Sequence, residues 1–395
     1  MDFYDRALEL KKELIENRRY LHKHAEVGMR LLVTKVFIKE KLKQYGLEPR
    51  DCGEGVTAVI GDGDGKVLLL RADMDALPMR EESGLDFACP TGKAAHTCGH
   101  DCHTAMLLTA AKMLKEYEKE IHGTVKLMFQ PAEETLKGGK HMVEHGILEN
   151  PKVDAALAYH VGAGKLPLGV FMYNETGTMM FATCMFRIRI QGRGSHGAYP
   201  QDAIDPIKIG MHIYMEMQEM VESEQARGQD CILTIGRFEA GSAPNVIPEV
   251  AVLEGSIRAG KAVMQENLVR RIKGILAEQA KKFGGTAELE EISSVPPLIC
   301  DSKMVKEIVG YMKELRVPGA VPYPDVTATA SEDFAVIAEK VPSVFIYLSA
   351  GFEDRRGEAT AHNPKVQFNE EVLPVGAAYL AYCAVRWLNT HHKSA

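Results

Sequence analysis

Between residues 102 and 160 the chain alternates helical segments with short strands that are apolar on both faces. Residues 102–120 and 140–148 have helical periodicity, whereas residues 124–129 and 153–160 form strand-length runs with few polar interruptions. Such strands are buried on both faces, and their alternation with helices is typical of a mainly parallel sheet covered by helices. This section therefore predicts an α/β domain with its sheet in the core.

Further helices and strands precede this section. Apolar residues at helical spacing predict an amphipathic helix over residues 3–21, and a second helix follows Thr34 and ends at Gly46. Apolar runs at 56–60 and 66–72 flank the spacer Gly-Asp-Gly-Asp-Gly, which is typical of a turn between two strands. The spacer lacks the further ligands and the closing Glu of a calcium loop, so no calcium site is expected there.

From about residue 181 the pattern changes to half-buried strands. The expected elements are strands at 182–191, 231–239, 249–258 and 287–292, and helices at 204–221 and 263–283. Their order, βαββαβ, is that of the ferredoxin-like unit, which is complete in itself. The α/β pattern then resumes with a helix at 302–315, a strand at 343–348 and a helix at 371–388. The predicted fold is an α/β, mainly parallel-sheet domain built from residues 1–179 and 294–395, with a ferredoxin-like lobe inserted at 180–293.

Composition excludes several classes of protein. Of the 395 residues, 46% are hydrophobic and 26% are charged, which is a globular balance and not that of a disordered or coiled-coil chain. The net charge is −7 without a basic cluster, so no nucleic-acid surface is expected. No apolar run approaches the ~18–20 residues of a membrane helix, and the charged N-terminus is not a signal peptide. Eight scattered cysteines favour a reducing, cytoplasmic compartment.

The densest group of polar side chains is the segment His-Thr-Cys-Gly-His-Asp-Cys-His at residues 96–103, just before a predicted helix. Imidazoles and thiols next to a carboxylate are typical of a divalent metal site with nitrogen, sulfur and oxygen ligands. A polar surface loop is the alternative for any single histidine, but the density of these side chains favours metal.

Three predicted strands end in further potential ligands. Asp73 and Asp75 follow strand 66–72, Glu133 and Glu134 follow strand 124–129, and His160 ends strand 153–160. Ligands collect at the carboxyl ends of parallel strands, so these side chains are expected at one edge of the sheet. One zinc ion needs about four ligands, and the surplus of carboxylates favours two metal ions a few ångströms apart.

Other motifs carry less weight. His141, Glu144 and His145 match the short H-x-x-E-H pattern of some zinc proteases, but they follow two glycines on a helix, and a solvated helix face is the preferred interpretation. Neither a nucleophile elbow nor a phosphate-binding loop occurs in the sequence. Ser195 and His196 are adjacent, and adjacent residues do not form a catalytic triad.

The motifs, taken in order along nearly the whole chain, resemble those of a known family. They are RADMDALP (71–78), CGHDCHT (98–104), FQPAEE (129–134), YHV (159–161), GRGSHGAYPQDAIDPI (192–207), PNVIPE (244–249), GSIR (255–258), SEDFA (331–335) and AHNPKVQF (361–368). The chain resembles the dinuclear metallo-amidohydrolases, the family of aminoacylases and metal carboxypeptidases. The most similar branch contains hippurate hydrolase, bacterial N-acyl-amino-acid amidohydrolases and plant auxin–amino acid hydrolases.

The resemblance implies a role for particular residues of the main domain. It implies the metal ligands Cys98, His100, Glu134, His160 and His362. It implies that Glu133 is the general base, and it adds His362, whose segment by itself suggests only a polar loop. Residues expected to orient the ligands are Asp75 and, with weaker support, Asp73, Asp101, His103 and Glu332. Cys102 replaces a glycine of the family pattern.

For the lobe, the resemblance implies a homodimer formed through residues 180–293. His196 would enter the neighbouring subunit's active site, and Asn245 and Arg258 would hold the substrate. A guanidinium fork suits a free carboxylate, although a surface charge at a strand end is the alternative for Arg258. Two divalent ions per subunit are expected, and Zn, Mn, Co and Ni all suit mixed nitrogen, oxygen and sulfur ligands.

The activity that the resemblance implies is hydrolysis of the amide bond of N-acyl-L-amino acids, with release of a carboxylic acid and a free amino acid. The alternatives are a dipeptidase and a deacylase dedicated to one intermediate, such as N-acetyl-diaminopimelate. A non-catalytic binding protein is disfavoured because all the implied ligands and the base are present in the sequence.

Overall fold

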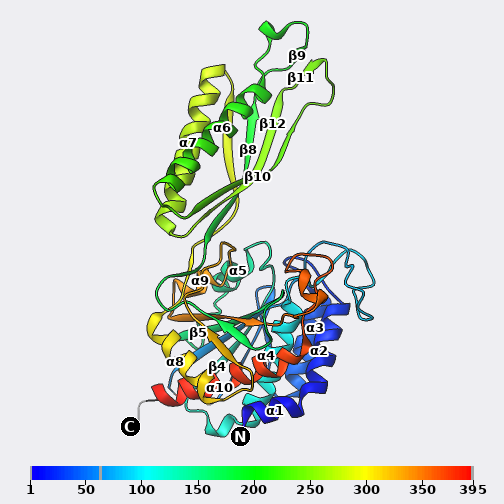
Figure 1. The fold of residues 1–395 in the computed structure, drawn as a ribbon, viewed down its shortest axis with the longest axis vertical. Helices are drawn as coiled ribbons and strands as arrows, with labels where there is room; N and C mark the ends of the chain where they lie inside the picture. Colours follow the sequence, from blue (N-terminus) through cyan, green and yellow to red (C-terminus); the bar gives the residue numbers. More distant parts are fainter. Residues whose placement is uncertain (1, 62–64, 393–395) are drawn as a thin grey trace. The chain divides into compact units, whose positions relative to one another are not determined.

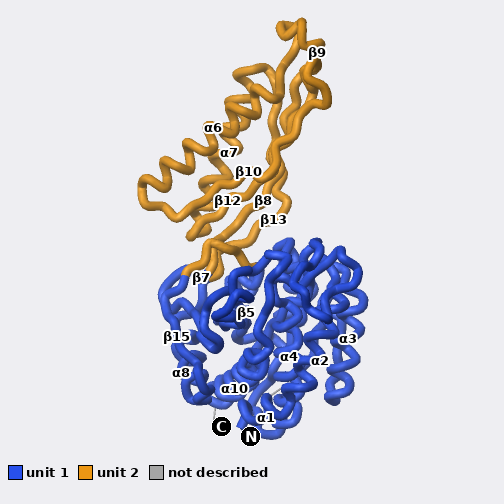
Figure 2. The backbone as a smooth tube through the Cα atoms, turned by 45° about the vertical axis from the view of Figure 1, so that its right-hand side comes forward, with its two compact units in different colours: residues 1–179, 299–326, 333–395 blue, residues 180–298, 327–332 orange. Residues whose placement is uncertain are grey.

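The computed structural model describes residues 2–61 and 65–392, and the chain divides into two compact units (Figure 2). Unit 1 comprises residues 1–179, 299–326 and 333–395, and unit 2 comprises residues 180–298 and 327–332. The sequence places the end of the lobe at residue 293, whereas unit 2 extends to 298 because its last long strand continues to Val295. The short segment 327–332 joins unit 2 because the backbone N–H of Phe181 donates to the carbonyls of Ala328 and Ala330.

A twisted sheet forms the centre of unit 1. Among the residues described, its eight strands follow the order β1-β2-β4-β3-β5-β16-β6-β15. Their bounds are β1 (Arg50–Cys52), β2 (Gly55–Ile60), β3 (Val67–Asp73), β4 (Thr124–Gln130), β5 (Ala155–Gly162), β6 (Val170–Met172), β15 (Val321–Tyr323) and β16 (Ser343–Ser349). The central strands β4, β3, β5 and β16 are parallel to one another, and every residue of β3 and β4 is buried. The predicted, mainly parallel sheet is confirmed.

Strands β2 and β3 are consecutive along the chain but do not pair with each other. β4 lies between them, antiparallel to β2 and parallel to β3. The turn expected between them covers residues 61–65, of which 62–64 lie outside the described residues. The sequence identified both strands but not their separation, because pairing depends on β4, which is distant in sequence.

Helices cover the sheet of unit 1 (Figure 1). They are α1 (Phe3–Glu9), α2 (Lys11–Lys23), α3 (Leu32–Gln44), α4 (His100–Glu116), α5 (Gly138–Glu144), α8 (Ser302–Glu314), α9 (Ala335–Ala338) and α10 (Leu373–His391), with 3-10 turns η1 (Glu118–Glu120), η3 (Arg355–Glu358) and η4 (Glu370–Val372). The single helix expected over residues 3–21 is divided at Leu10 into α1 and α2. Helix α4 is buried over most of its length, because it packs against the sheet, α2 and α10.

Unit 2 has the predicted ferredoxin-like topology. Its antiparallel sheet follows the order β10-β12-β8-β13, which is second, third, first and fourth along the chain. The bounds are β8 (Ala182–Gln191), α6 (Pro206–Ala226), β10 (Cys231–Ala240), β12 (Val250–Ala259), α7 (Ala262–Phe283) and β13 (Thr286–Val295). Shorter elements of unit 2 are β9 (Ser195–His196), η2 (Pro200–Asp202) and β11 (Val246–Ile247), whereas β7 (Thr178–Met180) and β14 (Leu298–Ile299) each include residues of both units.

The two helices of unit 2 pack on one face of its sheet. The core formed there includes Phe186, Ile188 and Ile190 of β8, Ile209, Ile213 and Met217 of α6, and Leu268, Ile272 and Leu276 of α7. These residues recur at every second position in the strand and at helical spacing in the helices, which is the pattern that one buried face requires. The fold class expected from the sequence is therefore confirmed.

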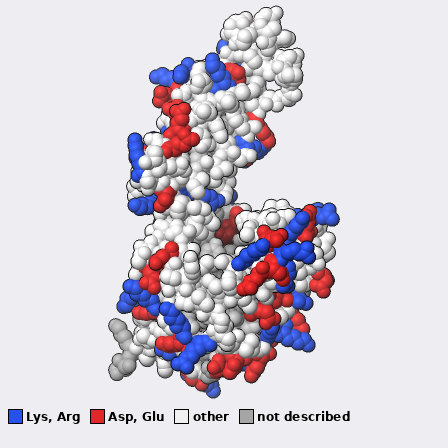
Figure 3. Space-filling model, in the orientation of Figure 1, with Lys and Arg blue, Asp and Glu red and all other residues white. Residues whose placement is uncertain are grey.

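Two further observations concern the charged surface and the length of the helices. On the face of unit 1 seen in Figure 3, basic side chains are interspersed with acidic ones and do not form a separate basic patch. Within the described ranges, no helix combines the length and the apolar character that crossing a bilayer requires.

Candidate metal centre

The carboxyl ends of the central strands of unit 1 deliver polar side chains to one edge of the sheet. β3 ends at Asp73, β4 ends just before the segment with Glu133 and Glu134, and β5 carries His160 near its end. Because these strands are adjacent and parallel, the side chains meet at one place. All of them are buried or nearly so, although Asp and Glu are rarely buried without a partner.

A glycine fixes the position of the two ligands that precede and begin α4. Gly99 is the N-cap of α4 and has a φ of 91°, in the left-handed region that favours glycine. A Cβ atom at this position would lie 2.5 Å from Cγ2 of Val161. The turn therefore needs glycine at this position. Cys98 and His100, which flank Gly99, are thereby placed at the edge of the sheet.

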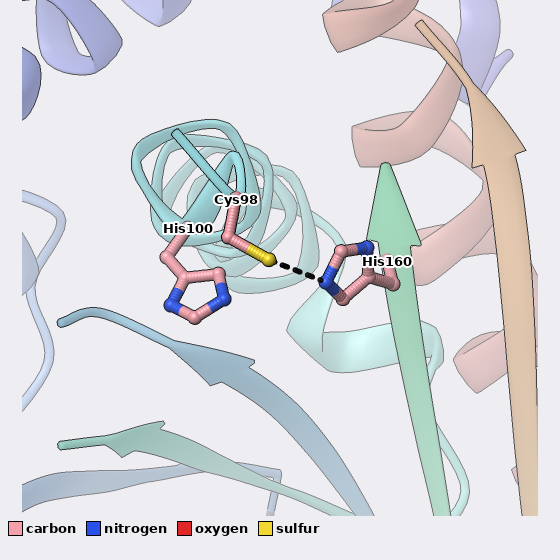
Figure 4. A group of neighbouring side chains, drawn as sticks. All are labelled: Cys98, His100 and His160. Atoms are coloured by element: carbon pink, nitrogen blue, oxygen red, sulfur yellow. Dashed lines mark hydrogen bonds between the residues drawn. The ribbon is translucent and has the colours of Figure 1, made fainter. Parts of the chain in front are cut away.

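Cys98, His100 and His160 form a buried group, in which one ligand atom of each lies within 4.8 Å of the others (Figure 4). The Sγ atom of Cys98 lies 3.5 Å from Nε2 of His160. Nδ1 of His160 lies 2.8 Å from the carbonyl oxygen of Val161, which can only accept a hydrogen bond. Nδ1 is thus the protonated nitrogen, and the lone pair of Nε2 faces the thiol, as a metal-binding imidazole requires.

A second group of potential ligands shares Cys98. It contains Glu134 and His362, and Oε2 of Glu134 lies 3.4 Å from Nε2 of His362. His362 has a φ of 66°, and its backbone N–H donates to the carbonyl of Thr97 over 3.0 Å. Glu133 and Glu134 also group with His100, whose Nε2 lies 3.9 Å and 3.8 Å from their carboxylates. The structure thus brings all five expected ligands and the expected base together within unit 1.

Some polar atoms of this centre have no hydrogen-bond partner among the described residues. They are both ring nitrogens of His100 and Oε1 of Glu134, and all are buried. Each unsatisfied buried polar atom destabilises the fold by about 1–3 kcal/mol. Atoms of this kind, directed into a group of sulfur, nitrogen and oxygen donors, fit bound cations.

The electrostatics of the site also favour cations. Burial raises the pKa of Glu134 to about 7, and the nearby carboxylates of Asp75 and Asp73 add to this rise. Burial likewise raises the pKa of the Cys98 thiol. A divalent ion would stabilise both the carboxylate and the thiolate, since ligation by Cys and Glu requires their deprotonated forms.

Asp75 and Asp73, which are not among the expected ligands, contact the ligands or the segments that carry them. Oδ1 and Oδ2 of Asp75 accept hydrogen bonds from the backbone N–H groups of Glu133 and Glu134, over 3.0 and 3.2 Å. Oδ1 of Asp75 also lies 3.4 Å from Nδ1 of His100. Asp73 accepts a hydrogen bond from Nδ1 of His103, whose Nε2 accepts the backbone N–H of Val161. Both nitrogens of His103 are therefore used within the fold.

Asp101 contacts a different part of unit 1. It accepts hydrogen bonds from Nε of Arg18 and Nδ1 of His22, over 2.9 and 2.8 Å, and so joins the first turn of α4 to α2. Sequence reasoning missed Arg18 and His22. Their spacing of four residues on a helix was the available signal.

A buried arginine network was also missed. Arg71 donates to Asp73 over 2.7 Å and to Asp333 over 3.2 Å. Asp333 also accepts the backbone N–H of Gly139 over 2.8 Å, which ties α5 to the same network. Although burial by itself would raise the pKa of Asp73, the charges of Arg71, His100 and His103 hold it well below its usual range. An arginine within the apolar run of β3 was the signal.

The H-x-x-E-H segment lies on α5 and is not part of this centre. The backbone N–H of Glu54 donates to Nε2 of His141 over 2.9 Å, and Nδ1 of His145 donates to the carbonyl of His141. Among the described residues, no cluster of three metal-binding side chains includes His141, Glu144 or His145.

The expected substrate-binding residues belong to unit 2. His196 lies in β9, which pairs with β11, and Asn245 directly precedes β11. The side chains of His196 and Asn245 are both exposed. Arg258 lies in β12 and donates to the carbonyl of Thr329 and to Oγ of Ser331, over 3.2 and 2.9 Å. Glu332, expected beside the metals, is buried and ends the short segment assigned to unit 2.

Within unit 2, His196 and Asn245 lie far from Arg258. β9 and β11 lie beyond the Val250 end of β12, whereas Arg258 lies near its other end (Figure 1). The steps from Val250 to Arg258 in an extended strand span about 26 Å. One lobe therefore does not gather these three side chains around one small molecule.

Comparisons with known proteins agree on one protein family. The model of peptidase family M20/M25/M40 matches residues 69–386. The N-acetyl-L-cysteine deacetylase of Bacillus subtilis is 32% identical over 98% of this chain and 90% of its own. The IAA-amino acid hydrolase ILR1-like 4 of Arabidopsis thaliana is 34% identical over 94% of this chain and 84% of its own. The crystal structure of a dinuclear metal-binding peptidase from Bacillus subtilis superimposes with a TM-score of 0.79, at 30% identity, over 97% of this chain and 99% of that one.

Proposed function

The chain belongs to peptidase family M20/M25/M40, and we propose that it hydrolyses N-acyl-L-amino acids to a carboxylic acid and a free amino acid. It is a metallo-amidohydrolase. The relatives named above are a deacetylase of N-acetyl-L-cysteine and a hydrolase of IAA-amino acids, so both names describe an amino acid with an acylated amine. This shared chemistry favours the N-acyl-amino acid over a dipeptide as substrate.

One observation carries the proposal: Cys98 belongs to two groups of potential ligands at once. One group is completed by His100 and His160, and the other by Glu134 and His362. These residues would hold two divalent cations, with the Cys98 thiolate shared between the two groups. When bound, such ions polarise the amide carbonyl and lower the pKa of a water molecule toward neutrality. Zn, Mn, Co and Ni all suit this set of donors.

Glu133 is the proposed general base. It is buried beside the ligands, and the hydrogen bond from its backbone N–H to Asp75 fixes the start of the segment that carries it. In the proposed reaction its carboxylate takes a proton from the attacking water and later delivers that proton to the leaving amine. Glu133 therefore acts twice, and the amine leaves in its neutral form.

The residues of unit 2 are proposed to complete the site from two subunits. Arg258 lies about 26 Å along β12 from Val250, and β9 and β11 lie beyond that end of the strand, so one lobe would not supply all three side chains. We propose that His196 and Asn245 act in the neighbouring subunit of a homodimer formed through residues 180–293. There His196 would stabilise the oxyanion of the tetrahedral intermediate, and Arg258 and Asn245 would bind the carboxylate of the amino acid.

Metal analysis of the purified protein, together with amino-acid release from a substrate panel, tests the proposal. The panel contains acetyl, benzoyl and indole-acetyl amino acids, matched dipeptides and N-acetyl-diaminopimelate. We expect about two divalent ions per chain and a kcat/KM at least tenfold higher for N-acyl-amino acids than for dipeptides. A preference for dipeptides, or activity that survives complete removal of metal, would contradict the proposal. The cytoplasmic location inferred from the cysteines stays a prediction.

A further inference from the structure

Unit 1 contains a cavity of about 670 Å³ that shares no residue with the metal centre. Strands β1 and β2, the end of α4, the middle of β4 and residues 145–151 line it. Cavities of roughly 300–1,000 Å³ are typical of sites for small molecules. The cavity is therefore large enough for a ligand of its own.

The cavity contains a buried lysine. Lys126 lies in the middle of β4 and is only 3% exposed. Its Nζ atom donates hydrogen bonds to the carbonyl oxygens of Glu149 and Pro151, over 2.5 and 3.4 Å. Among the described residues no carboxylate lies within ion-pair distance of this ammonium group, and its burial lowers its pKa. The charge of Glu149, an exposed residue of the cavity wall, acts on Lys126 only from beyond ion-pair distance, and a buried charge without a counter-charge in contact with it destabilises the fold unless an anion approaches it.

Among the charged side chains that line the cavity, Lys126 is the buried one, since Lys115 is half-buried and the others, Glu48, Arg50, Asp51 and Glu149, are exposed. Nζ of Lys115 donates to Glu118 over 2.5 Å, and Asp51 accepts from Lys39 over 2.7 Å. Lys115 and Asp51 are thus each neutralised by a residue that does not line the cavity. Lys126 is thus the buried charge that would attract a ligand.

The wall beside Lys126 is apolar. Val59 of β2 is the antiparallel partner of Lys126, so both side chains lie on the same face of the sheet. Val59 is 45% exposed although its strand is otherwise largely buried, and Leu47 and Ile147 line the same cavity. An exposed apolar side chain beside a buried ammonium group suits a ligand that has an anionic head and an apolar body.

We propose that this cavity binds a small carboxylate with an apolar body, whose carboxylate contacts Nζ of Lys126 and whose body covers Val59. The site is separate from the proposed hydrolytic reaction, because no proposed ligand, base or substrate-binding residue lines it. Occupancy would add one hydrogen bond, from Lys126 to the ligand, to the two that Lys126 donates to the 145–151 segment.

Methyl-resolved NMR of the metal-loaded protein tests this proposal. The probe is 4-fluorophenylacetate, and its neutral amide is the control ligand. Leu47, Val59 and Ile147 report on the cavity, whereas Val161, which lies beside Gly99 and His103, reports on the metal centre. We expect saturable shifts of the cavity methyl groups with the carboxylate, and an affinity at least tenfold weaker for the amide.

Two variants and a matched control locate the binding. Lys126→Met removes the ammonium group, and Val59→Trp fills the apolar part of the cavity while leaving Lys126 in place. We expect each to weaken binding at least tenfold, whereas Lys306→Met, which removes an exposed lysine of α8, leaves it unchanged. The proposal is overturned if the wild-type cavity methyl groups do not shift, if only Val161 shifts, or if the folded Val59→Trp protein binds as the wild type does.

Discussion

The Gly99→Ala substitution tests whether the turn before α4 sets both the stability of unit 1 and its metal centre. An L residue in the left-handed conformation of Gly99 costs about 1–2 kcal/mol. The added Cβ would lie 2.5 Å from Val161 and 3.0 Å from Phe368, and overpacking of this kind costs about 1–3 kcal/mol more. We expect unit 1 to lose about 2–5 kcal/mol of unfolding free energy, together with metal and activity, because Cys98 and His100 flank the turn.

Urea unfolding followed by the fluorescence of Trp387 measures this loss. Trp387 is the one tryptophan of the chain and lies buried in α10, so it reports on unit 1. Gly84→Ala is the matched control, because Gly84 has a φ of 74° but nothing lies within 4 Å of a Cβ placed there. It should lose only the backbone contribution of about 1–2 kcal/mol. If Gly99→Ala is no less stable than Gly84→Ala and keeps its metal, the reasoning from close packing is wrong.

Three further predictions concern the base, the dimer and pH. Glu133→Gln should retain its metal but lose about 10²–10⁴-fold in kcat, and near-normal turnover would exclude Glu133 as the base. Mixed dimers of His196→Ala with Glu133→Gln subunits should regain part of the activity of one intact site, and verified heterodimers without activity would count against action in the neighbouring subunit. Burial opposes the charged form of His22, but the charge of Asp101 and the hydrogen bonds to Asp101 and Glu81 raise its pKa to about 9. The stability that His22 contributes is therefore complete below pH 6.5 and is lost as the pH rises through 9, by roughly 3 kcal/mol, and His22→Gln should flatten this part of the curve of unfolding free energy against pH.

The elements of unit 2 could be predicted well because each has one buried face. The strand expected at 182–191 is β8, and the helix expected at 263–283 differs from α7 by one residue at its start. Alternation in the strands and helical spacing in the helices both point to the same core. For unit 1, the sequence predicts where the buried strands lie along the chain but not their order in the sheet. A strand that is apolar on both faces does not specify its neighbours.

The metal centre likewise contains residues that the strand pattern places and one residue, in a loop, that it does not. Asp73, Glu134 and His160 could be placed near one another because each lies near the carboxyl end of a strand, and these strands are neighbours in one parallel sheet. His362 could not, because it comes from a loop whose position depends on a left-handed backbone and on one hydrogen bond to Thr97. Only the resemblance to a family identified it.

The missed arginines show why a polar network in the core is harder to predict than a ligand set. The role of Arg71 depends on the hydrogen bonds that it donates to Asp73 and Asp333, which lie 2 and 262 residues away in sequence. Ligands for one cation must converge, so several of them in one chain support one another as evidence. A buried ion pair needs only one partner, and any of the 54 acidic residues could supply it. The sequence alone therefore predicts a convergent site more readily than the contacts that hold its loops in place.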